Sequence, residues 1–73
     1  MLLVYKLNNK VYICLDHIVG EGTVEVKDEK KKVIHTHQFR NSNYEKVDMK
    51  DRKGDFTFRI NYESETIIKH LQI

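Results

Sequence analysis

Apolar and polar residues alternate in short runs along most of the chain, and the first two runs form a pair. Residues 2–7 and 11–19 are rich in aliphatic, β-branched and aromatic side chains, and Asn8-Asn9 lies between them. Asn tolerates the positive φ that a two-residue turn requires, so the pattern predicts a β-hairpin. The segment 11–15 is apolar on both faces, which places this strand in the middle of a sheet.

A second hairpin is predicted after Gly20-Glu21-Gly22, which interrupts the first apolar pattern. Residues 23–27 alternate cleanly, with Val24 and Val26 directed inward. The charged run 27–32 is then expected to form the loop, and residues 33–39 the returning strand. In that strand Val33, His35, His37 and Phe39 share one face, because side chains alternate across a strand.

The segment 40–53 is the most polar part of the chain and leaves two structures open. Ser42 and Glu45 have the spacing of a capping box, and Gly54 lies where a helix would end. The apolar residues of this segment form a poor helical stripe, however. A short helix within 43–53 and an extended segment therefore remain alternatives.

The C-terminal third begins with a clear strand and ends ambiguously. Residues 55–62 alternate, with Phe56, Phe58, Ile60 and Tyr62 on one side. Residues 64–73 favour a further strand, although a helix beginning at Ser64 fits the same residues.

These elements predict a mainly β protein in which residues 1–73 form a single domain. We expect an antiparallel sheet of five or six strands, closed into a compact barrel or folded over itself, with one short helix near 43–53 or at the C-terminus as the alternative. A chain of 73 residues buries only about 60% of the surface that its unfolded form exposes, so the core must be thin.

Composition points to a cytoplasmic protein without covalent reinforcement. Cys14 is the only cysteine, so no internal disulfide can form. The apolar opening is broken by Lys6, which argues against a signal peptide, and no apolar run approaches the roughly 20 residues of a membrane span. Abundant Lys, Asn and Ile with no Pro or Trp suggest AT-rich coding sequence, and hence a low-GC bacterium or its phage.

Candidate chemistry is sparse. His35 and His37 point the same way on one strand, but two ligands fall short of the three or four that a zinc site needs. Cys14, Ser42 and Ser64 lack the glycine-flanked setting of an activated nucleophile. We therefore expect no enzyme, no metal, no cofactor and no small-molecule substrate.

Nucleic-acid binding by a basic face is the second hypothesis for function. Small β-barrels bind single strands through basic grooves and exposed aromatic rings. Interleaved Asp and Glu residues dilute every basic cluster here. The residues nominated for this contact are Lys30, Lys31, Lys32, Arg40, Arg52 and Lys53.

The first hypothesis is contact with another protein, because the first hairpin has more apolar surface than one thin layer can hide. Alternation on each strand suggests two apolar faces: Leu2, Val4, Tyr12, Cys14 and Ile18 on one, and Leu3, Tyr5, Leu7, Ile13 and Leu15 on the other. A second sheet layer, a second copy or a target protein would cover them. We therefore expect a small binding module, an accessory or inhibitor protein of a phage or mobile element or a homo-oligomer, whose contact surface includes His35, His37 and Tyr44.

Overall fold

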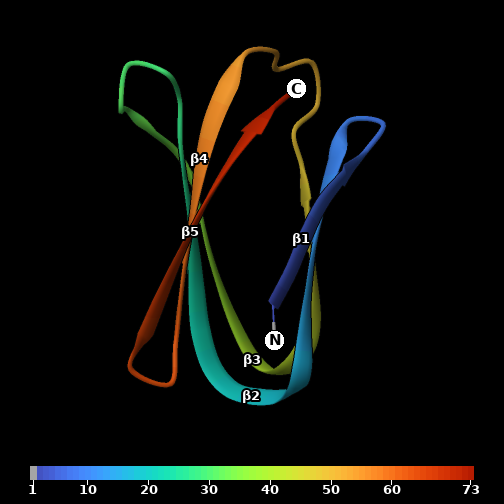
Figure 1. Cartoon of the computed structure of the whole chain (residues 1–73), viewed down its shortest axis with the longest axis vertical. Helices are drawn as coiled ribbons and strands as arrows, with labels where there is room; N and C mark the ends of the chain where they lie inside the picture. The colour runs from blue at the N-terminus through green and yellow to red at the C-terminus, as the bar shows by residue number, and fades with distance from the viewer. Residues whose placement is uncertain (1) are drawn as a thin grey trace.

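The computed structural model describes residues 2–73, which form five antiparallel strands and no helix (Figure 1). The strands are β1 (Leu2–Leu7), β2 (Lys10–Lys27), β3 (Val33–Asp48), β4 (Asp55–Tyr62) and β5 (Glu65–Gln72). The predicted antiparallel, mainly β fold is confirmed. Both helical alternatives are wrong, because residues 43–48 belong to β3 and residues 65–72 to β5.

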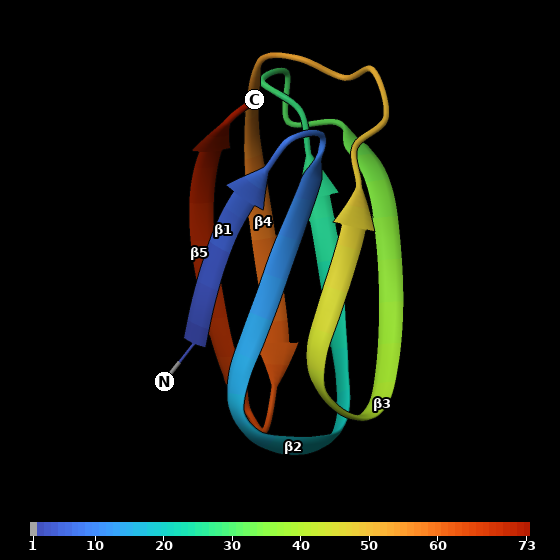
Figure 2. The ribbon, with the colours of Figure 1, turned by 90° about the vertical axis from the view of Figure 1, so that its right-hand side faces the viewer.

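The sheet is folded over itself around β2, the longest strand. The first half of β2 pairs with β1 and with the second half of β3. Its second half pairs with β4 and with the first half of β3, and β4 pairs in turn with β5. The result is a three-stranded layer facing a four-stranded layer, joined where β2 and β3 curve together (Figure 2). The prediction that the second strand occupies the middle of the sheet is confirmed.

The fold at this corner comes from extra residues in β2. Cys14 is opposite Tyr44 and Val19 is opposite Ser42, so β2 advances five positions while β3 advances two. An odd number of extra residues reverses the alternation of side chains across the strand, and such bulges bend a strand. Val11, Ile13 and Leu15 therefore point inward before the corner, and Val24 and Val26 do so after it.

The core lies between the two layers, and its buried side chains come from β2, β3 and β4 and from Met49, just after β3. Its largest fully buried side chains are Phe58, Ile13, Met49 and Ile60. The two remaining strands pack against this core with side chains that are not fully covered, Leu2 and Val4 of β1 and Ile67 and Leu71 of β5. No helix in residues 2–73 is long and apolar enough to cross a membrane.

Gly22 lies inside β2 and does not end a strand, so the predicted interruption at residues 20–22 is wrong. Gly22 is opposite Phe39, and the Phe39 ring lies directly over the glycine backbone. A Cβ atom on Gly22 would overlap that ring. The glycine is therefore required by the close approach of an aromatic side chain across the strand pair.

We predict that Gly22→Ala lowers the free energy of unfolding by about 1–3 kcal/mol, because the added methyl group must displace the Phe39 ring from its place in the core. Gly20→Ala is the matched control, since a Cβ atom there meets no atom within 4 Å. Urea denaturation of the two variants measures the difference. Equal stabilities would show that the Phe39 ring does not lie over Gly22.

Candidate functional site

Three tyrosines form a row across the outer side of the three-stranded layer. Tyr5 of β1 is directly opposite Tyr12 of β2, and their ring centroids are 5.2 Å apart with 20° between the planes. The Tyr12 ring stacks in turn with Tyr44 of β3, at 6.0 Å and 29°. Cross-strand aromatic pairs of this kind stabilise a sheet and fix the positions of the rings.

Aliphatic side chains extend this row into a larger apolar surface. Leu3 and Leu7 of β1 are 51% and 56% exposed, and Tyr44 is 50% exposed. Cys14, opposite Leu3, lies on the same side and is half-buried. We call this surface the tyrosine face; its members are Leu3, Tyr5, Leu7, Tyr12, Cys14 and Tyr44.

The first hairpin therefore has two apolar faces, as predicted, but the residues assigned to each face are wrong. Leu2 is opposite Leu15, and Val4 is opposite Ile13. Directly opposite residues project to the same side of a sheet, so Leu2 and Val4 pack on the core with their partners. Ile18 belongs to neither face, because it lies in the corner of β2 where the pairing is interrupted.

Charged residues of both signs border the tyrosine face. Lys46 is opposite Tyr12, and Lys10 is opposite both Leu7 and Asp48. Partial desolvation, followed by the neighbouring Tyr12 and Tyr5 hydroxyls, raises the pKa of Tyr44 above its ordinary value. The Tyr44 hydroxyl is thus a neutral hydrogen-bond donor and acceptor at physiological pH.

His35 and His37 are not part of this face. They lie in the first half of β3, opposite Val26 and Val24, with their rings 6.3 Å apart. His37 Nε2 lies 2.5 Å from Glu45 Oε1 in the second half of the same strand. Of the three residues predicted to frame a contact surface, the structure places Tyr44 on the outer side and both histidines on the opposite side of the sheet.

Glu45 is held between two partners. Its Oε2 accepts a hydrogen bond from the Ser42 hydroxyl at 2.5 Å, while Oε1 contacts His37. The capping box predicted from their spacing is wrong, because Ser42 and Glu45 lie within a strand and bond through their side chains. In residues 2–73 no group of three or more His, Cys, Asp or Glu side chains has the arrangement of a metal site.

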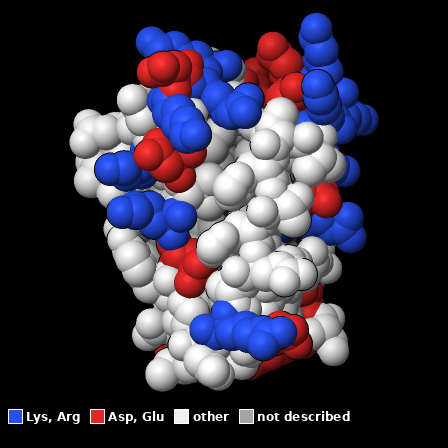
Figure 3. Space-filling view, turned by 180° about the vertical axis from the view of Figure 1, so that it is seen from behind, with Lys and Arg blue, Asp and Glu red and all other residues white. Residues whose placement is uncertain are grey.

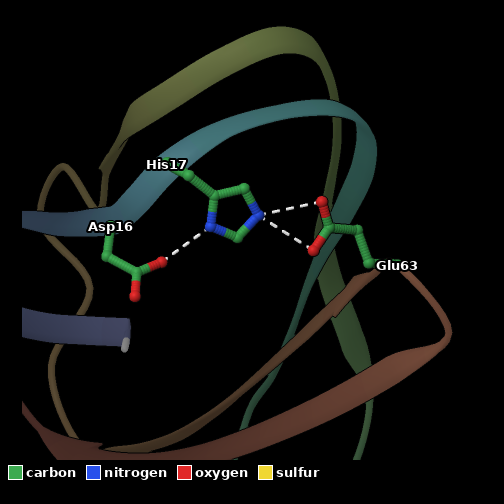
Figure 4. A network of polar contacts seen from close by, with 3 residues as sticks. All are labelled: Asp16, His17 and Glu63. Carbon is green, nitrogen blue, oxygen red and sulfur yellow. Dashed lines mark hydrogen bonds and ion pairs between the residues drawn. The ribbon is translucent and has the colours of Figure 1, made fainter.

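A second polar network joins the corner of β2 to the turn between β4 and β5 (Figure 4). His17 Nδ1 lies 2.7 Å from Asp16 Oδ1, and His17 Nε2 lies 2.8 Å from Glu63 Oε2. Hydrogen bonding to Asp16 and then to Glu63 raises the pKa of His17 above its ordinary value. No local sequence pattern predicts this contact, because 46 positions separate His17 from Glu63.

We predict that the stabilising effect of His17 depends on pH. A raised pKa in the folded state means that the contribution is complete below the ordinary histidine pKa and is lost as the pH rises through the raised value. The melting temperature of the wild type should therefore exceed that of Glu63→Gln most at about pH 6 and least at about pH 9.

High salt is the control, because the network is exposed and its ion pairs are screened. A difference between wild type and Glu63→Gln that stays constant across this pH range would contradict a charged His17 in the network.

The predicted basic cluster is only partly assembled. Lys30, Arg52 and Lys53 line one surface hollow, but Asp28, Glu29 and Asp55 line it too. Lys31 borders a neighbouring hollow, and Lys32 closes the same turn through its backbone N–H to Asp28. Arg40 lies apart at the corner of the sheet, with Glu21 3.9 Å away. Figure 3 shows basic and acidic side chains mixed at the upper end of one side and uncharged residues through its middle.

The chain matches no known protein family, and no curated protein is significantly similar to it.

Proposed function

We propose that this protein is a non-enzymatic binding module that contacts another protein through the tyrosine face. The observation that carries the proposal is the exposed row of stacked tyrosines flanked by Leu3 and Leu7. Contiguous exposed apolar surface of this kind marks interaction sites in small soluble proteins.

Several properties of the face suit protein recognition. Tyrosine contributes a large contact area at low entropic cost and is enriched among the residues that dominate binding energy. Stacking on neighbours holds the three rings in place before any partner binds. The border of Lys10, Lys46 and Asp48 supplies the mixed polar rim that surrounds apolar contact surfaces.

The polar networks support a non-enzymatic role. The Ser42 hydroxyl donates to one oxygen of the Glu45 carboxylate, and His37 contacts the other oxygen. The carboxylate thus lies between serine and histidine, whereas in a catalytic triad the histidine occupies the middle position. The single cysteine favours action in the cytoplasm. The amino-acid composition, which is typical of AT-rich coding sequence, favours an accessory or inhibitor protein of a phage or other mobile element.

The proposal predicts that Leu7→Ser combined with Tyr44→Ser lowers the recovery of a binding partner by about tenfold or more, because both side chains are half-exposed members of the tyrosine face. Affinity capture from host lysate, quantified by mass spectrometry, measures recovery. Ile68→Ser is the matched control, since Ile68 is 55% exposed but lies on β5.

A protein recovered by the wild type and by Ile68→Ser, but not by the double variant, supports the proposal once the purified pair binds in solution. Equal recovery by all three proteins would reject the tyrosine face as the contact surface.

Nucleic-acid binding is the second candidate, favoured by the convergence of Lys30, Arg52 and Lys53 beside Phe56. Two features weaken it. Phe56 is only 5% exposed and offers no free ring surface for a base. The tyrosine rings also stack on one another, which covers part of the surface that bases would use.

Fluorescence anisotropy with labelled single-stranded and duplex DNA and RNA decides between the two candidates. We expect no saturable binding at about 50 mM salt. Binding that weakens steeply towards about 200 mM salt, and is lost in Arg52→Ser, would make the basic hollow the functional surface.

A further inference from the structure

The outer edge of β1 carries backbone groups without a strand partner. Among residues 2–73, β1 pairs only with β2. The two-residue turn makes Leu7 and Lys10 a hydrogen-bonded pair, so the backbone groups of Leu3, Tyr5 and Leu7 point towards β2. Those of Leu2, Val4 and Lys6 therefore point away from the sheet.

A separate contact supports this assignment. The Met49 N–H donates to the Asn9 carbonyl oxygen at 2.8 Å, so odd-numbered residues at this end of β2 direct their backbone towards β3. Even-numbered residues of β2 then face β1, and their partners in β1 are the odd-numbered ones.

The side chains of β1 do little to protect this edge. Natural proteins block open edges with charges, proline, bulges or covering segments. Lys6 is the only charged residue of β1, and the chain contains no proline. By contrast, the other two outer strands carry more charge: β3, which also pairs only with β2 among the described residues, has Arg40, Glu45, Lys46 and Asp48, and β5 has Glu65 and Lys69.

We propose that a second copy of this chain pairs with β1, antiparallel and about a two-fold axis at Val4. Val4 then lies opposite Val4 of the second copy, and Leu2 lies opposite its Lys6. Three pairs, Leu2 with Lys6, Val4 with Val4 and Lys6 with Leu2, use the outward-pointing backbone groups of both strands. The hydrogen-bond ladder is therefore completed without shifting either strand.

The side chains fit this register better than the registers obtained by moving the two-fold axis to a neighbouring residue. Leu3 of one copy lies opposite Tyr5 of the other, so exposed apolar residues of both copies cover one another. The backbone positions of the two Lys6 residues are about 13 Å apart along the strands, given the rise per residue of a strand. This separation exceeds the Debye length of about 8 Å at physiological ionic strength.

Shifting the two-fold axis to Tyr5 leaves two hydrogen-bonded pairs in place of three, because only Val4 and Lys6 then pair through outward-pointing backbone groups. Shifting it to Lys6 places the two lysines directly opposite each other. A second copy satisfies both exposed edges at once through the same residues, which is the property of an isologous interface. The pairing would join two three-stranded layers into one and set two tyrosine faces side by side. It goes beyond the proposed function, because it requires no other protein.

Sedimentation equilibrium of the full chain tests the pairing. We expect a concentration-dependent mass that approaches twice the 8.8 kDa of one chain. Val4→Pro removes an outward-pointing N–H and leaves the β1–β2 ladder intact, so dimerisation should weaken by about tenfold or more. A wild type that stays monomeric at every concentration, or a dimer unaffected by Val4→Pro, would overturn the proposal.

Oxidative cross-linking tests the register and does not depend on the proline variant folding. In a Cys14→Ser background, Val4→Cys should form a disulfide-linked dimer, because opposite Cα atoms in a hydrogen-bonded pair are about 5.5 Å apart. Lys6→Cys is the matched control and should not cross-link. Cross-linking of Lys6→Cys alone, or of neither variant, would contradict the register. Partner capture by the tyrosine face is measured separately, so the two proposals can fail independently.

Discussion

The bend in β2 is the constraint on which the rest of the structure depends. Three more residues in β2 than in β3 at the corner reverse the side-chain alternation, so one strand supplies inward-facing residues to both layers. Without this reversal, Val24 and Val26 would face solvent when Val11 and Ile13 face the core. The close approach of Phe39 to Gly22, just after the corner, fills the space where the layers meet.

The same bend leaves a defined apolar surface outside the core. The three-stranded layer has only one side covered, so the apolar residues on its other side remain open. The tyrosines of this surface stack on one another, and charged residues of both signs border it. This face is the surface through which we propose that the protein binds its partner.

The strands with regular alternation were predictable from sequence. The alternation within residues 55–62 and 33–39 was enough to predict these two strands, and the Asn8-Asn9 turn was enough to predict the first hairpin. Residues 40–48 were not predictable, because their polar sequence becomes a strand only through pairing with β2. Gly22 was misread because a glycine that accommodates a distant ring and a glycine that ends a strand look alike in sequence.

The candidate site was recovered only in part for a similar reason. Tyr44 was predicted to belong to the contact surface, but Tyr5 and Tyr12 were assigned to opposite faces. The prediction grouped odd-numbered and even-numbered residues of the two strands without knowing which residues are opposite one another. Opposite residues of this hairpin have numbers that sum to 17, so an odd residue shares its face with an even one. The contact between His17 and Glu63 depends on the folding of the whole sheet and has no local signal.

Solvent paramagnetic relaxation of side-chain protons tests the central claim, that the bend separates an internal core from an open tyrosine face. A soluble gadolinium chelate should strongly relax the Leu7 methyl and Tyr44 ring protons, which pairing of β1 would leave open, and should barely affect Ile13 and Val24. Protection of Leu7 and Tyr44, together with strong relaxation of Val24, would contradict the reversal at the corner and the account built on it.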